Sequence, residues 1–219
     1  MGLGFFDPHL PALKFDFSRD EWAARKACWS TVQLNQVVQA TSSLVAKVVE
    51  ASCPSPLVLV HLQRINRRFL SCPCIEDSRA LARRLHADHP TALDVMLRVV
   101  VEGDLLSLVA VQTMFHWSYG PDGCKTMVAI GVVETLMSML PMVSPCVKHC
   151  ALKLLNRLAG QTPSAVARLL RPRHLRSLLQ VLQPNNTSAN IAAELRLLEL
   201  ILRHPKANVL LNHRSGYVY

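Results

Sequence analysis

The segment GVVETLMSML, residues 131–140, has a counterpart about 42 residues later in RHLRSLLQVL, residues 173–182. The two segments share no long identity, but their apolar positions coincide, so that Leu136 falls over Leu178. Apolar residues that recur every three or four positions, as they do within each segment, lie on one face of a helix. Recurrence of such a helix at a fixed period indicates a repeated structural unit, and a repeat decides the fold.

Each copy belongs to a longer unit in which a short helix is followed by a break and then by a longer helix. The longer segments are CVKHCALKLLNRLAG at residues 146–160 and AELRLLELILRH at residues 193–204. Upstream, LDVMLRVV and LLSLVAVQTMFHWSYG, residues 93–100 and 105–120, repeat the same order. We therefore expect an all-α fold, in which stacked units bury the apolar faces that one unit leaves exposed.

A third, short helix precedes each of the two opening segments, at residues 121–131 and 163–170, and Gly131 stands at the first of these turns. Three helices in this order, with a period of about 40 to 43 residues, resemble the armadillo repeat. The resemblance covers residues 91–212. It implies a right-handed helical solenoid whose last unit, starting at Pro205, is incomplete. A non-repeating helical bundle is the alternative.

The sequence predicts four regions of different character. Residues 1–19 form an extended apolar arm, residues 20–90 an N-terminal helical cap, residues 91–212 the repeats and residues 213–219 a tail. The arm is expected to dock either on the chain's own body or on another molecule, because aromatic side chains bury well. Its aromatic residues are Phe5, Phe6, Phe15 and Phe17. The incomplete last unit predicts either a folded-back tail or a partner chain that covers it.

Three helices are expected in the N-terminal cap. Ser18 and Glu21 form a capping-box pattern, which predicts one long helix from Ser18 to about Ser52. A second helix should begin at Pro56, because proline is favoured at the first helical position. A third should begin near Asp77.

The resemblance implies that the longest helix of each unit lines a binding groove. Related import receptors carry a tryptophan and an asparagine one turn apart on that helix. Here the two positions hold Lys153 and Arg157 in one unit, Thr113 and Trp117 in the unit before it, and Arg196 in the unit after it. The peptide-clasping ladder is therefore absent. Lys153 and Arg157 suit an acidic partner, unless they lie on the solvated outer face.

A basic surface is predicted from the charge balance. The formal net charge is +9, which favours an acidic partner such as a protein surface or nucleic acid. Arginine pairs well with carboxylates and phosphates. The clustered arginines are Arg64, Arg67, Arg68, Arg83, Arg84, Arg168, Arg171, Arg173 and Arg176.

Several classes of protein are not expected. No apolar run reaches the length of a membrane span, and the chain shows no nucleophile motif, phosphate loop or paired carboxylates. We expect neither an enzyme nor a cofactor. The seven cysteines, which lack a framework and follow no signal peptide, predict free thiols in a reducing compartment and no metal site, although Cys72 and Cys74 form one close pair.

These features favour a non-enzymatic structural or adaptor protein that binds acidic partners in a large cytoplasmic assembly. By analogy of fold, the favoured partner is tubulin or another axonemal protein of the cytoskeleton and cilium. One alternative is an RNA- or ribonucleoprotein-associated repeat protein. The other is a signalling adaptor that takes acidic peptides into its groove.

Overall fold

The computed structural model describes residues 28–51, 55–101, 104–181, 188–205 and 207, and within them every regular element is a helix. The prediction of an all-α fold is confirmed. The first helices are α2 (Thr31–Glu50), α3 (Pro56–Leu70), α4 (Ile75–Asp88), α5 (Ala92–Val99) and α6 (Asp104–Trp117). They are followed by α7 (Pro121–Ala129), α8 (Val132–Met139), α9 (Pro145–Gln161), α10 (Pro163–Leu169), α11 (Pro172–Val181) and α12 (Ser188–Leu202).

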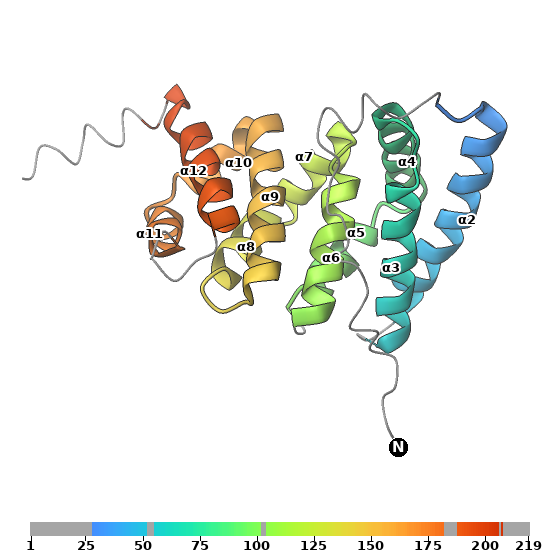
Figure 1. The fold of residues 1–219 in the computed structure, drawn as a ribbon, viewed down its shortest axis with the longest axis horizontal. Helices are drawn as coiled ribbons and strands as arrows, with labels where there is room; N and C mark the ends of the chain where they lie inside the picture. The colour runs from blue at the N-terminus through green and yellow to red at the C-terminus, as the bar shows by residue number, and fades with distance from the viewer. Residues whose placement is uncertain (1–27, 52–54, 102–103, 182–187, 206, 208–219) are drawn as a thin grey trace, which may run out of the picture.

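Four of the longer helices form a row that runs through the molecule in chain order. Helix α3 packs on α6, α6 packs on α9, and α9 packs on α12 (Figure 1). The shorter helices lie beside this row: α5 contacts α6, while α7, α8 and α10 all contact α9. The two inner members, α6 and α9, are therefore each packed between the preceding and the following long helix and short helices.

The N-terminal helix begins later than the sequence predicts. Residues 28–30 are not helical, so the long helix expected from Ser18 to Ser52 is wrong across this stretch, and Ser18 itself lies outside the described residues. Helix α2 starts at Thr31, where the Ser30 and Gln33 side chains form a capping box. A second serine-based cap, with glutamine at its third helical position, outweighs continuation of the helix.

Two other local predictions are confirmed. Helix α3 begins at Pro56, and the Ser55 hydroxyl accepts a hydrogen bond from the backbone N–H of Val58. Gly131 joins α7 to α8 with φ at +92°, a left-handed conformation that glycine adopts without strain. Helix α4 begins at Ile75, two residues before the predicted start.

The core is densest around α6. All residues from 111 to 120 are buried, and the α6 sequence is apolar around most of its circumference. Gly123 lies against the end of α6, and a Cβ atom at this position would lie only 2.7 Å from the Trp117 carbonyl oxygen. Glycine here permits α7 to approach the end of α6 closely.

The cysteines correct one prediction. Cys28 and Cys74 form a disulfide with their Cα atoms 5.5 Å apart, so the expectation that all cysteines are free thiols is wrong for this pair. Among the described residues the free cysteines are Cys72, Cys124, Cys146 and Cys150. Within the same residues, no helix combines the length and apolarity needed to cross a membrane.

Candidate binding groove

A groove of about 720 Å³ opens between α9 and α12, with one contribution from α6. It is lined by Phe115, His149, Lys153, Asn156, Arg157, Ala189, Ala192, Ala193 and Arg196. The three basic residues come from two helices, and no aspartate or glutamate appears among these lining residues. The groove is therefore a basic concavity rather than a neutral one.

Helix α9 positions two of the three cations. It starts at Pro145 and buries a stripe that includes Val147, Ala151, Leu154 and Leu158. Lys153 and Arg157 are one turn apart and only partly exposed, on the face that meets α12. The open question of whether they lie on the outer face or in the groove is thus decided by the packing of α12.

Asparagine side chains fix α12 against α9. The Asn156 amide donates to the Ala193 carbonyl at 2.7 Å and to the Leu152 carbonyl at 2.9 Å. At the other end of the contact, the amide of the buried Asn190 donates to the Pro145 carbonyl at 3.2 Å. These bonds hold the backbone of α12 in register, and the small side chains of its alanines leave the hollow above it.

Aromatic rings support Arg157. Its guanidinium carbon lies 4.7 Å from the ring centroid of Phe115 and 4.4 Å from that of Tyr119. A guanidinium at this distance from an aromatic face is attracted by the ring quadrupole. Both rings are buried, so they restrict the motion of Arg157 and pre-organise it for a planar acidic group.

The electrostatics of the contact depend on burial. Burial, and then the Lys153 ammonium, lower the pKa of His149, against a side-chain hydrogen bond with Asn190 that raises it. Glu194, on the buried side of α12, is fully enclosed, and neither carboxylate oxygen has a hydrogen-bond partner in the described part of the chain. Burial raises its pKa to about 7, although the Lys148 ammonium opposes this shift.

The structure brings together three of the five residues predicted to line a groove: Lys153, Arg157 and Arg196. The prediction is wrong for Thr113 and Trp117, which are both fully buried. The Thr113 hydroxyl donates to the Val109 carbonyl at 2.8 Å, and Trp117 packs against Phe69. Because α6 is apolar on most sides, its own sequence does not reveal which face is the outer one.

Sequence reasoning missed the aromatic and amide members of the groove. Phe115 lies two residues before Trp117, on a helix already assigned to the groove, and Asn156 immediately precedes Arg157. The spacing of Phe115 from Trp117 could have indicated that the two rings point in different directions. The Asn156 bond to α12 required knowledge of the neighbouring helix.

Two of the arginines predicted to form a basic surface are paired with a carboxylate of the same chain. The Glu134 carboxylate accepts hydrogen bonds from Arg168 at 2.9 Å and from Arg171 at 3.1 Å. Although burial acts to raise the pKa of Glu134, its hydrogen bond and ion pairs with these arginines hold that pKa below its usual value. Arg171 remains exposed despite this pairing, as are Arg64, Arg67, Arg68, Arg83, Arg84, Arg173 and Arg176, whereas Arg168 is half-buried.

The predicted docking arm, with Phe5, Phe6, Phe15 and Phe17, lies outside the described residues. Comparison of the chain with family models, curated proteins and solved structures finds no match. The chemistry of the site therefore rests on its own geometry. A basic, partly enclosed groove with a pre-organised guanidinium is suited to hold carboxylates or phosphates.

Proposed function

We propose that this chain is a non-enzymatic binding protein that receives an acidic protein segment in the groove between α9 and α12. One observation carries the proposal: Lys153, Arg157 and Arg196 line one groove, and no acidic side chain is among the residues that line it. Aromatic support of Arg157 favours a planar carboxylate, to which a guanidinium donates two parallel hydrogen bonds.

The proposed fold is an armadillo-like, right-handed solenoid. The row of α3, α6, α9 and α12 supports it, because each member packs on the next and the last three each follow two shorter or equal helices in sequence. The triplets would be α4–α6, α7–α9 and α10–α12. This grouping starts the repeats at Ile75 rather than at residue 91, and it leaves α2 and α3 as the N-terminal cap.

The partner favoured by the sequence is tubulin or another acidic axonemal protein. The groove supports an acidic partner, and it adds a specific place for an acidic segment to bind. Cytoskeletal or ciliary placement is a further proposal that rests on analogy of fold. The ribonucleoprotein alternative rests instead on the exposed arginines of α3 and α4, which lie outside the groove.

Fluorescence anisotropy with a short, fluorescein-labelled, glutamate-rich peptide tests the groove. Reversing both groove charges with Lys153→Glu and Arg157→Glu should weaken binding about 100-fold or more, since each reversal replaces an attraction by a repulsion. The matched control reverses Arg64→Glu and Arg68→Glu. It makes the same change in net charge on two exposed residues at the same helical spacing on α3.

Equal weakening by both pairs of substitutions would show that only the overall charge matters, and it would overturn a specific groove. Single-stranded RNA as competitor distinguishes the alternative. If RNA displaces the peptide from the wild type, and the α3 reversal abolishes RNA binding, the ribonucleoprotein interpretation gains support. Microtubule co-sedimentation of the wild type and of the groove variant then tests the tubulin proposal directly.

A further inference from the structure

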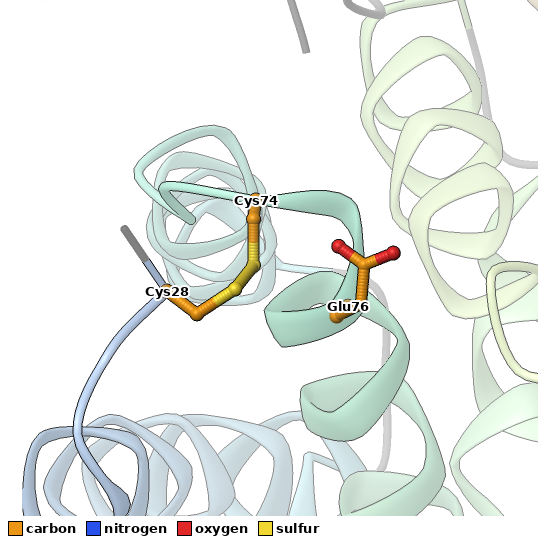
Figure 2. A group of neighbouring side chains, drawn as sticks. All are labelled: Cys28, Cys74 and Glu76. Carbon is orange, nitrogen blue, oxygen red and sulfur yellow. A yellow bond between two sulfur atoms is a disulfide. The ribbon is translucent and has the colours of Figure 1, made fainter. Parts of the chain in front are cut away.

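A second cluster with its own chemistry lies at the other end of the molecule. Figure 2 shows Cys28, in the segment before α2, reaching across to Cys74 at the start of α4, with Glu76 in the first turn of that helix. The two sulfur atoms and one carboxylate oxygen of Glu76 all lie within 4.8 Å of one another. Cys28 and Glu76 are exposed, so the cluster is open to solvent.

The cluster is held together by contacts other than the disulfide. The backbone N–H of Trp29 donates to the Asp77 carboxylate at 2.9 Å, and Trp29 packs against the core. Asp77 is buried in the first turn of α4. Because this bond fixes the residue next to Cys28, Cys28 stays beside Cys74 when the bond between the two sulfurs is broken.

Cys74 places its sulfur at the N-terminus of α4. It is the N-cap residue of α4, and its sulfur accepts a hydrogen bond from the backbone N–H of Asp77 at 3.4 Å. A helix N-terminus stabilises a thiolate, which is the form that binds metals. The same sulfur lies 3.2 Å from the Asp77 carboxylate, so in the reduced chain a cation that binds here would offset the repulsion between the carboxylate and a Cys74 thiolate.

We propose that the reduced cluster binds one Zn²⁺ ion through the sulfurs of Cys28 and Cys74 and the carboxylate of Glu76. Two thiolates and a carboxylate are zinc donors, and donors around a tetrahedral zinc lie roughly 3 to 4 Å apart, within the span of this cluster. Three protein ligands leave the fourth position to a water molecule. Asp77 is not itself a proposed ligand; its hydrogen bonds with Trp29 and Cys74 orient the two segments that carry the cysteines.

The zinc site and the disulfide exclude each other because both use the same two sulfurs. A dithiol converts one state into the other: the bond between Cys28 and Cys74 breaks, and the two sulfurs gain two electrons and two protons. The dithiol closes into its own disulfide and thereby supplies both. Zn²⁺ then displaces the two thiol protons, so binding should weaken as the pH falls.

Cobalt(II) is the probe for this site, because its thiolate charge-transfer absorption reports sulfur ligation and its visible bands report tetrahedral geometry. The full chain is reduced with dithiothreitol, freed of reductant under argon and titrated. We expect one equivalent of Co²⁺ to bind with the absorption of two thiolates, and Zn²⁺ to displace it. Cys28→Ser and Cys74→Ser should each abolish this spectrum. Glu76→Gln should weaken Co²⁺ binding about tenfold or more, because loss of a ligand costs at least as much as loss of a group that supports one.

Two controls keep the test independent of misfolding. Cys146→Ser removes an exposed thiol on α9 and should leave the spectrum unchanged. Cys124 and Cys150 are buried, and burial raises their pKa to about 11 and about 12, which disfavours the thiolate form that binds the probe. The oxidised wild type, which needs no substitution, should give no cobalt absorption.

Either of two results would overturn the zinc proposal. The first is the absence of a thiolate–cobalt spectrum from the reduced wild type. The second is a spectrum that persists in the oxidised chain or in both serine variants. Neither result bears on the acidic-peptide groove, which lies on different helices.

Discussion

The α3–α6 contact and the α9–α12 contact are each fixed by an asparagine side chain that donates to a backbone carbonyl, but the first is filled by side chains and the second leaves a groove. In the first, the Asn66 amide donates to the Val109 carbonyl at 3.2 Å, and in the second the Asn156 amide donates to the Ala193 carbonyl at 2.7 Å. Each bond fixes one long helix on the next. What surrounds the bond decides whether the contact is filled or open.

Aromatic rings fill the α3–α6 contact. Phe69 stacks on His116 with ring centroids 5.2 Å apart and an interplanar angle of 7°, and it also meets Trp117 at 6.4 Å. At the α9–α12 contact, the corresponding space is bordered by Ala189, Ala192 and Ala193 and opens into the basic groove. Small side chains on one helix thus make a binding site where large ones would make core.

Each contact also buries an ionisable group, and burial shifts the pKa values of the two groups in opposite directions. Burial, and then the Arg157 charge, lower the pKa of His116 to about 3, whereas burial raises the pKa of Glu194 to about 7. Both groups are neutral near pH 6 in the folded chain. The filled contact should therefore lose stability in acid, and the open contact should lose it in base.

The largest effect is expected from Trp117→Ala, which empties the filled contact. Removing a fully buried indole should lower the free energy of unfolding by about 3 to 5 kcal/mol, through lost transfer energy and a residual cavity. Urea denaturation measures this. Met142→Ala, at a side chain that is 80% exposed, is the control and should change little. A loss below about 1 kcal/mol would contradict the central role of this contact.

The next effect concerns the fall in the free energy of unfolding as the pH drops below 7, which we call the acid limb. The lowered pKa of His116 means that the unfolded chain binds its proton more tightly. Stability from this group is present above about pH 6.5 and is lost as the pH falls toward 3. His116→Phe should reduce the loss between pH 7 and pH 4.5 by roughly 2 to 3 kcal/mol. The measurement is a series of urea transitions across that range.

His86→Phe serves as the comparison for the acid limb, because His86 lies on α4, outside the filled contact, and is only partly buried. An unchanged acid limb in His116→Phe would mean that this histidine accepts a proton without unfolding the contact. The filled contact would then be less rigid than its packing indicates.

A smaller effect of opposite sign is expected from Glu194→Gln. The raised pKa of Glu194 means that the folded chain binds its proton more tightly. Stability from this group is present below about pH 4.5 and is lost as the pH rises through about 7. The glutamine variant should therefore exceed the wild type by about 1 to 2 kcal/mol at pH 8 and match it near pH 5. Thermal unfolding at both pH values measures the difference.

Glu199→Gln is the matched control on the same helix, because Glu199 is exposed and pairs with Arg203. It should shift stability by less than about 0.5 kcal/mol at either pH. If Glu194→Gln is less stable than the wild type at pH 8, Lys148 compensates the buried carboxylate fully, and the contrast between the two contacts fails.

Part of this molecule follows from local sequence. Apolar periodicity predicted the helices, Pro56 after Ser55 predicted the start of α3, and Gly131 predicted a turn. The sequence also predicted that Lys153 and Arg157 share a helix face and that Arg196 falls at the matching place 43 residues later, but it left open whether that face lines a groove. These features depend on residues within one or two helical turns, or on the recurrence of similar residues further along the sequence.

Tertiary structure alone decided which contacts are filled and which polar groups are paired. The apolar α6 has no polar face to mark its outside, so only packing shows that Thr113 and Trp117 are core. Glu134 on α8 pairs with Arg168 on α10 and with Arg171 between α10 and α11, and Cys28 meets Cys74 across a separation of 46 residues. Periodicity fixes which residues share a helix face. The neighbour that meets that face is chosen by the free energy of packing the whole chain, which no local pattern contains.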